Sequence, residues 1–203
     1  MIHPDTELRF ISPEIGYGVV ATKFIPKGTI TWIQDPLDRI FTPEQIEKLD
    51  PVYQDKLHTY SYRDNQGNFV LCWDNSKFIN HSFHSNCITT PYNFELAVRD
   101  IHPGEELTDD YGYLNVTEPF ICLPEPNTNR TMVMPDDLLH FYKEWDAQLI
   151  EAFKHFNKVA QPFAKLIDPK YKNKVLQIAA GKTQMDSILT CYYRGEKKKV
   201  FAV

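Results

Sequence analysis

The chain carries the stretch FINHSFHSN at residues 78–86 and, after a short intervening segment, GEELTDDYG at residues 104–112. Both stretches set dense polar residues beside apolar ones such as Phe78 and Ile79. A polar side chain in apolar surroundings has to satisfy its donors and acceptors, either with backbone groups or with a bound ligand. The two stretches are therefore the first candidates for a functional site.

The chain around these stretches, up to about residue 112, has mostly β character. Short extended runs bounded by turn residues such as Pro26 and Gly28 predict strands. These runs lie at residues 8–11, 16–21, 25–30, 69–73 and 95–98. The run 69–73 follows a hairpin-like turn at residues 65–68, and its unbroken apolar character predicts a strand buried on both faces.

Two short helices are predicted between the strands. Residues 42–45 have the features of a helix start, with Thr42 as the N-cap, Pro43 at the first helical position and Gln45 at the capping-box position. This helix is expected to run to about residue 49, and a second helix is expected over residues 52–58.

The sequence changes character after a Pro-rich loop at residues 119–126. Over residues 136–157, apolar residues recur at helical spacing with charged residues between them, which predicts one long amphipathic helix. Its aromatic stripe is interpreted as a packing surface rather than a cofactor site. A further helix is predicted over residues 170–180 and should end at Gly181.

Composition narrows the functional classes. The 203 residues, 42% of them hydrophobic, can bury one core, with or without a modest helical appendage. The net charge of -5 and the pI near 5.8 argue against direct nucleic-acid binding, which needs a basic face to neutralise phosphates. The basic run Lys197–Lys199 is interpreted as a solvated tail rather than a docking patch.

Cysteine spacing and the N-terminus favour an intracellular protein. The four cysteines form no CxxC pair and no histidine stands at metal-ligand spacing, so neither a disulfide framework nor a metal site is expected. The N-terminus lacks the features of a signal peptide, and no apolar stretch approaches the roughly 18 residues of a membrane span. We expect no membrane association and a cytoplasmic location, or a nuclear one in a eukaryotic host.

Three segments together resemble the SET-domain family of protein-lysine methyltransferases. Residues 16–30, GYGVVATKFIPKGTI, resemble the opening of the family's domain. Residues 78–86 are similar to the family pattern F-I-N-H-S-C-x-P-N and keep both asparagines, and residues 106–112 resemble the closing E-L-T-Y-D-Y-G. A glycine-x-glycine alone is common in turns, but three matches in the family's order are specific.

The resemblance implies an α+β protein with the β-clip-like SET fold, in which small β-sheets surround a pseudoknot and helices follow at the C-terminal end. The pseudoknot would thread the two polar segments past each other, an exception to the usual simple connections. The SET domain is assigned to residues 1–116, with a variable insert at about 35–62 that helps to build the substrate groove. Residues 117–203 would form a Pro-rich connection and a helical region packed on the SET core.

The resemblance also implies the activity, an S-adenosylmethionine-dependent protein-lysine N-methyltransferase. The methyl donor and the peptide would enter from opposite faces and meet in a narrow channel. Transfer is an in-line displacement, so the protein has to hold a neutral lysine nitrogen about 3 Å from the methyl carbon, and no metal is required. The partner would be a protein or peptide with an exposed lysine.

Site residues follow from the same resemblance. The backbone of Gly16, Tyr17 and Gly18 would approach the donor, because glycine lets a main chain come close to a ligand. Asn80 and His81 would bind the donor's amino and adenine ends. The alternative for both is a buried polar knot that fastens the two segments.

The channel itself would be built around Tyr111, which matches the family's channel tyrosine and is the predicted catalytic residue. Its alternative role is that of a core tyrosine with a satisfied hydroxyl. Tyr113 either shares the channel wall or is a plain strand tyrosine. Tyr60 or Tyr62 would supply a further channel aromatic, with packing as the alternative role.

The sequence departs from the family in two places. The zinc-binding segment that usually follows the domain is absent, so we expect Phe120 to Leu123, with the 136–157 helix behind, to form an apolar lid over the adenine. Asp109 stands where the family has Tyr or Phe. If the segment is extended, it shares a face with Tyr111, where it would stabilise a lysine cation, hold water, or point into solvent. The number of methyl groups added stays open.

Two further functions remain. The Asp109 departure and the missing zinc segment allow a catalytically impaired SET-like scaffold, and methylation of a small-molecule amine is a third possibility. The long helix either packs on the core or forms a dimer interface, so both a monomer and a homodimer are expected states.

Overall fold

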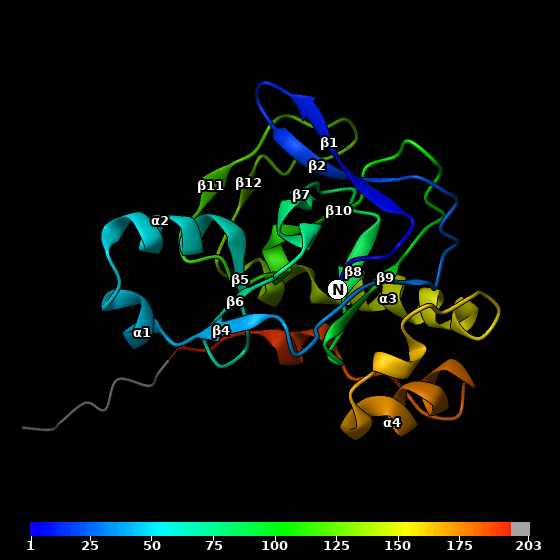
Figure 1. Ribbon diagram of the computed structural model, residues 1–203. Coiled ribbons are helices and arrows are strands. Elements are labelled where there is room, and N and C mark those ends of the chain that lie inside the picture. The colour runs from blue at the N-terminus through cyan, green and yellow to red at the C-terminus, as the bar shows by residue number, and fades with distance from the viewer. Residues whose placement is uncertain (196–203) are drawn as a thin grey trace, which may run out of the picture.

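The computed structural model describes residues 1–195, and the basic run Lys197–Lys199 lies outside the described residues. The fold consists of small sheets with helices at both ends (Figure 1). This is the α+β architecture of small sheets that the sequence predicts. No helix within residues 1–195 has the length and apolarity needed to cross a membrane.

The strands form five small sheets. They are the antiparallel pair β1 (Thr6–Ser12) and β2 (Gly16–Ala21), the sheet β3 (Ile30–Ile33), β9 (Phe94–Ala97) and β8 (Cys87–Thr89), the sheet β4 (Arg39–Phe41), β6 (Phe69–Leu71) and β5 (Ser61–Arg63), the pair β11 (Phe120–Ile121) and β12 (Met132–Val133), and the parallel pair β7 (Asn80–His81) and β10 (Thr108–Asp109).

Two predicted strands are shorter than expected. The run 25–30 becomes a strand only at Ile30, because Gly28 turns the chain with a φ of +88°. Within the run 69–73, β6 ends at Leu71, and Trp73 is 47% exposed. The prediction of a strand buried on both faces therefore holds for Phe69 and Val70 alone.

The insert folds into two short helices beside the sheet of β4, β6 and β5. Helix α1 (Pro43–Glu47) has the predicted Thr42–Gln45 capping box, although it ends before residue 49. Helix α2 (Pro51–Tyr60) is longer than predicted, because Asp50 caps it by accepting from the Val52 N–H. A small apolar cluster of Ile46, Leu57 and Phe69 fixes the helices to the sheet.

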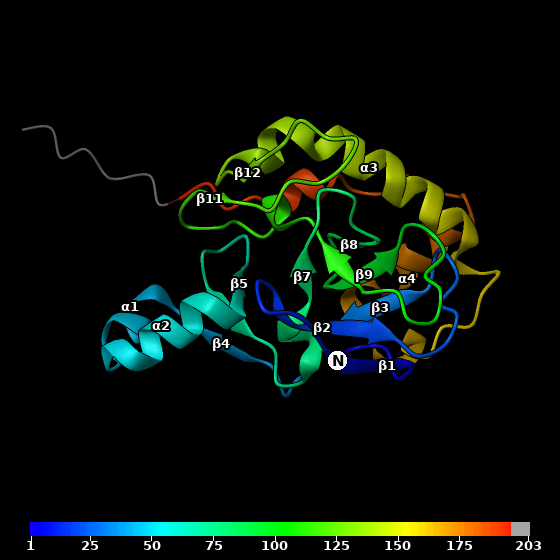
Figure 2. The same ribbon diagram turned by 90° about the horizontal axis from the view of Figure 1, so that it is seen from above.

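The C-terminal region supplies the largest part of the core. The predicted long helix is α3 (Asp137–Phe156), which lies along β8 and β9 (Figure 2), and α4 (Pro169–Ala179) follows it. The apolar stripe of α3, Leu138, Trp145, Leu149, Ala152, Phe153 and Phe156, is buried against strand residues such as Phe94 and Leu96. The stripe is therefore a packing surface, as predicted. Within residues 1–195, four short 3-10 helices lie at Asn75–Phe78, Tyr111–Tyr113, Ala164–Leu166 and Ile188–Cys191.

The two polar stretches of the sequence meet at β7 and β10. Asn80 pairs with Thr108 and His81 pairs with Asp109 in parallel register. Asn86, which is fully buried, holds the second stretch in place: its Nδ2 donates to the Glu106 carbonyl oxygen at 2.7 Å, and its Oδ1 accepts from the Thr108 N–H at 2.9 Å. One asparagine thus satisfies two backbone groups that a strand pair this short leaves unpaired.

Candidate active site

A cavity of about 470 Å³ lies between the insert and the β10 segment. Its walls include Tyr60, Tyr62, Glu95, Asp109, Tyr111 and Phe120. Four of the predicted channel residues therefore share one cavity with the predicted lid residue Phe120. Glu95, on β9, also lines the cavity and was not predicted as a site residue. A single charged residue in a strand pattern usually marks a solvated face.

Tyr111 is held at both its backbone and its hydroxyl. Its hydroxyl donates to the Ile79 carbonyl oxygen at 2.6 Å, and its N–H donates to His81 Nδ1 at 3.1 Å. Burial raises the pKa of Tyr111, so the hydroxyl is neutral at physiological pH. Because its one proton is directed at Ile79, the phenolic oxygen keeps its lone pairs free to accept from a group in the cavity.

The backbone around Tyr111 is not extended, contrary to the prediction. Residues Tyr111–Tyr113 form a 3-10 helix that begins at Asp110, whose Oδ1 accepts from the Gly112 N–H at 3.0 Å. Asp109 nevertheless lines the same cavity as Tyr111. The shared wall results from the turn at Asp110 rather than from strand alternation.

Tyr113 lies behind the cavity wall and does not line it, so the prediction of a place on the wall is wrong. Only 1% of it is exposed, and its ring packs edge-on against Trp145 at 5.2 Å. Its hydroxyl is 2.9 Å from Asp109 Oδ1 and 2.9 Å from the Cys87 carbonyl oxygen. Tyr113 therefore supports Asp109 from the side opposite the cavity.

Asp109 and Glu95 form a buried pair of carboxyl groups, with 4% and 6% of their surface exposed. Burial raises the pKa of Asp109 to about 7, against the opposing effect of hydrogen bonds from Tyr113 and Glu95. Burial, reinforced by the Asp109 charge, raises the pKa of Glu95 well above its usual range. The two carboxyl groups therefore titrate as a pair, and burial favours their protonated forms. The expectation that Asp109 points into solvent is excluded.

The residues predicted to bind the methyl donor lie around Asn80. Its Nδ2 donates to the Tyr17 carbonyl oxygen at 3.0 Å and to Glu106 Oε1 at 2.7 Å. A Cβ at Gly18 would overlap Glu106 Oε1 and lie 2.9 Å from Asn80 Nδ2, so Glu106 or Asn80 would have to shift to admit another residue. Gly16 has a φ of +83°, a conformation that glycine adopts readily. The Gly16–Tyr17–Gly18 turn and Asn80 are therefore in direct contact.

His81 is neutral and presents an unused donor. Burial lowers its pKa, and its Nδ1 accepts from the Tyr111 N–H, which leaves the proton on Nε2. Within residues 1–195, that buried Nε2 has no hydrogen-bond partner. The ring lies among Phe83, Tyr111 and Phe120, at centroid distances of 4.4, 5.5 and 5.9 Å.

Of the predicted lid, Phe120 lines the cavity. It packs against the rings of His81 and Tyr111, whereas Ile121 and Leu123 are 79% and 57% exposed. The alternation in β11 explains this difference, because successive side chains of a strand point to opposite faces. The expectation of an apolar lid over 120–123 is therefore corrected to Phe120.

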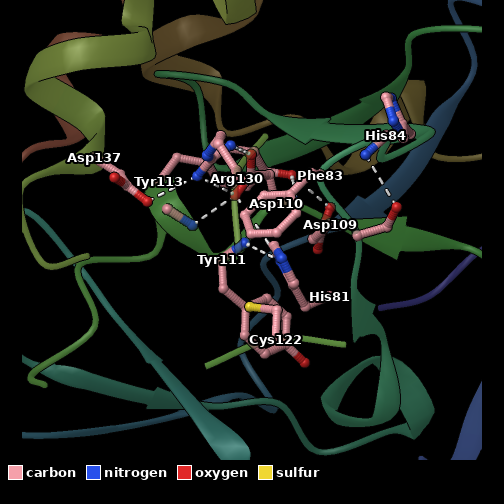
Figure 3. Close-up of polar contacts among 12 residues, drawn as sticks. His81, Phe83, His84, Asp109, Asp110, Tyr111, Tyr113, Cys122, Arg130 and Asp137 are labelled. Carbon is pink, nitrogen blue, oxygen red and sulfur yellow. Dashed lines mark hydrogen bonds and ion pairs between the residues drawn. The ribbon is translucent and has the colours of Figure 1, made fainter. Parts of the chain in front are cut away.

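Arg130 fastens the β11–β12 hairpin to the rest of the molecule (Figure 3). Its guanidinium pairs with Asp110 and, from Nη2, with Asp137 Oδ2 at 2.7 Å. The same group lies over the rings of Phe83 and Phe141, 4.3 Å from each centroid. We call Arg130, Asp110 and Asp137 the arginine clasp. The sequence gave no signal for it, since a lone arginine in a Pro-rich loop is usually solvated.

A second carboxylate of the same connection supports the polar segment. Glu125 accepts from the Ser82 hydroxyl at 2.9 Å and from the Phe83 N–H at 3.0 Å. The connection after residue 116 is therefore fixed to the segment that follows His81.

The family model and a curated relative agree with the resemblance. Residues 16–112 match the family model described as SET domain. Over 117 residues, the chain is 31% identical to the histone-lysine N-methyltransferase Set2 of Drosophila melanogaster, a match that covers 52% of this chain and 5% of that protein. A solved structure of a presumed histone methyltransferase from Plasmodium falciparum is 19% identical with a TM-score of 0.40, covering 54% of this chain and 95% of that one.

Proposed function

We propose that this chain, whose residues 16–112 match the SET-domain family model, is an S-adenosylmethionine-dependent protein-lysine N-methyltransferase. The observation that carries the proposal is the position of Tyr111. Its hydroxyl borders the cavity, and its N–H is bound by His81 of the segment predicted to hold the donor. A tyrosine oxygen with free lone pairs thus lies between a candidate amine channel and a candidate donor site.

The residues at the donor end fit S-adenosylmethionine. The buried Nε2–H of His81 lacks a partner among the described residues, and Glu106 offers a carboxylate that attracts an amino group. Bound there, the donor supplies an electrophilic methyl group on a sulfonium. The residues that would hold it are Gly16, Tyr17, Gly18, Asn80, His81 and Phe120.

Tyr111 would orient both the methyl group of the donor and the amine of the substrate. Its oxygen can accept weak C–H···O contacts from a methyl group and a hydrogen bond from an amine. Tyr60 and Tyr62 line the same cavity and offer apolar faces for the aliphatic stem of a lysine. Together these contacts favour one in-line arrangement of nitrogen and methyl carbon, which is the main task in this transfer.

A catalytically impaired binding module is the second candidate, and the Asp109–Glu95 pair favours it. A carboxylate beside the amine stabilises the ammonium form, which has no lone pair for attack. On this alternative the cavity would bind a lysine without methylating it.

Two measurements separate the candidates. Calorimetry with S-adenosylmethionine tests the donor site, and transfer of a labelled methyl group to lysate proteins tests catalysis. We expect donor binding and a labelled protein band that disappears with Tyr111→Phe. Donor binding without any labelled protein would favour the binding module, and absence of donor binding would exclude the enzyme.

A further inference from the structure

The Asp109–Glu95 pair is part of the cavity wall rather than of the core behind it. Both carboxyl groups line the cavity that Tyr111 borders, although they come from different strands, β10 and β9. Tyr113 holds Asp109 from behind with a hydroxyl at 2.9 Å from Oδ1. The pair is therefore fixed in position and its open side faces the cavity.

The wall also carries polar atoms that have no protein partner. Glu95 Oε2 and Trp32 Nε1 are buried, both residues line the cavity, and neither atom has a hydrogen-bond partner in the described part of the chain. Buried polar groups are normally satisfied. Glu95 Oε2 is an acceptor and points to a ligand that donates, whereas Trp32 Nε1 is a donor that needs an acceptor of its own. An ammonium ion, with three donors and a positive charge, suits two adjacent carboxyl groups.

The groups around the pair do not neutralise it. The titratable groups that interact with the charge of Asp109 are Tyr111, Tyr113, Asp110 and Cys87, and those that interact with Glu95 are Tyr62, Cys72, Tyr113, Cys87 and the amino group of Met1. Burial raises the pKa of the Tyr113, Cys87, Tyr62 and Cys72 side chains, so all four are neutral at physiological pH. Asp110 is engaged by Arg130. The Met1 amino group pairs with Asp35 at 3.0 Å, so a cation in the cavity would find the carboxylate of Asp109 without a charged partner of its own.

We propose that Asp109 and Glu95 form a carboxyl pair that binds the substrate amine as an ammonium ion and accepts its proton before methyl transfer. This inference rests on the proposed function and specifies how its amine becomes nucleophilic. Asp109 is the acceptor, and Glu95 holds the second proton of the pair and hydrogen-bonds the Asp109 carboxylate.

The step balances without any other reactant. The N–H bond of the ammonium breaks, its proton goes to an Asp109 oxygen, and the electron pair stays on nitrogen. That lone pair then forms the N–C bond to the methyl group while the C–S pair leaves with sulfur as a neutral thioether. The methylated nitrogen carries the positive charge, and Asp109 returns its proton to water. A group with a pKa near 7 suits both halves of this cycle at neutral pH.

The test uses n-butylammonium as a probe of the lysine side chain. Protein labelled with ¹³C in its Asp and Glu carboxyl groups is titrated from about pH 5 to 9 with and without the probe. Because a bound cation favours the ionised carboxylate, we expect butylammonium to lower the pH at which the Asp109 resonance titrates, and the neutral analogue n-butanol to leave the titration in place. A titration that does not move, or that moves equally with n-butanol, would overturn the proposal. A methyl-transfer rate with the same pH dependence in the wild type and in Asp109→Asn would overturn the proton transfer.

Matched variants identify the site. Asp109→Asn keeps size and should weaken butylammonium binding by about tenfold or more, because it removes the charge of a buried site. Glu95→Gln, in which a neutral amide replaces the protonated acid, should weaken binding less. The exposed Asp55→Asn on α2 should leave the affinity unchanged. Unaltered butylammonium affinity in both buried variants would exclude the pair. Calorimetry with S-adenosylmethionine on the same proteins reports on the proposed function separately, so failure of the donor site and failure of the amine site are distinguishable.

Discussion

The hydroxyl of Tyr111 donates a hydrogen bond of 2.6 Å to the carbonyl oxygen of Ile79. Ile79 lies directly before β7, so this bond links the end of the second polar stretch to the start of the strand that carries Asn80 and His81. The bond fixes both the ring position and the direction of the phenolic proton. The oxygen is thereby prepared to accept, not donate, on its cavity side.

Replacing Tyr111 by Phe should remove methyl transfer while preserving donor binding. The variant loses the oxygen that aligns methyl and amine, and we expect a fall in rate on the order of 100-fold, as for the loss of one oriented electrostatic contact. Donor affinity by calorimetry should change little. Tyr53→Phe, at a residue of α2 that is 62% exposed, is the matched control and should keep the wild-type rate.

Breaking the arginine clasp should release the β11–β12 hairpin. Arg130→Lys cannot bind two carboxylates in a fork, and the nearly inaccessible Asp110 would be left poorly paired. We expect a loss of about 3 kcal/mol in the free energy of unfolding, typical of a broken buried ion pair, and faster amide exchange in residues 117–135. Arg99→Lys, in a partly exposed pair with Glu105, should cost less than about 1 kcal/mol. Equal losses in the two variants would contradict a special role for the clasp.

A methyl group at Gly18 should disturb the donor site. In Gly18→Ala the new Cβ overlaps Glu106 Oε1 and approaches Asn80 Nδ2 to 2.9 Å, so Glu106 or Asn80 has to move. We expect donor affinity to fall by about tenfold or more, since a displacement at a positioned site readily costs 1.4 kcal/mol. The control is Gly104→Ala, which has a φ of +87° and open space around it. It should lower stability by about 1 kcal/mol through backbone strain and leave the affinity for the donor intact.

Asp109 should make the free energy of unfolding fall as the pH rises, and the variant Asp109→Asn should lack this dependence. Its pKa is raised from 3.8 to about 7, so between these values the folded protein holds a proton that the unfolded chain has released. Stability therefore falls as pH rises through this window and levels off above it. Asp109→Asn should flatten the slope and be the more stable protein above about pH 7, by a few kcal/mol at most, because one pKa unit corresponds to about 1.4 kcal/mol. Urea unfolding from pH 5 to 8 measures this; parallel curves for the two proteins would refute the buried, raised pKa.

His81 should make the protein less stable as the pH falls, the opposite of the pH dependence expected from Asp109. Burial lowers its pKa below 6.5, so the unfolded chain takes up a proton that the folded protein resists. Stability due to this residue is present above the unfolded value and is lost as pH falls below it. His81→Gln should weaken that acid dependence, measured by thermal unfolding from pH 7 to 5. His58→Gln, at an exposed position of α2, should follow the wild type.

Much of the fold was predictable because its signals are local. The capping box at Thr42 and Gln45 and the apolar stripe of α3 each depend on neighbours within a few residues. The three family segments added the order of the elements, which the match over residues 16–112 confirms. The short strand at 25–30 was misjudged because a turn at Gly28 interrupts an otherwise apolar run.

The sequence by itself supplied the resemblance to the SET-domain family and singled out Asn80, His81 and Tyr111 as candidate site residues, because motif spacing can be recognised without knowledge of the packing. Only the tertiary structure decided that Glu95 lies beside Asp109, that Tyr113 stands behind the cavity, and that Arg130 joins Asp110 to Asp137. Each of these contacts joins separate elements of the fold, and each depends on burial. A carboxylate or guanidinium gives no sign in the sequence of whether it will be solvated or buried, since its partner and its dielectric surroundings exist only after the chain has folded.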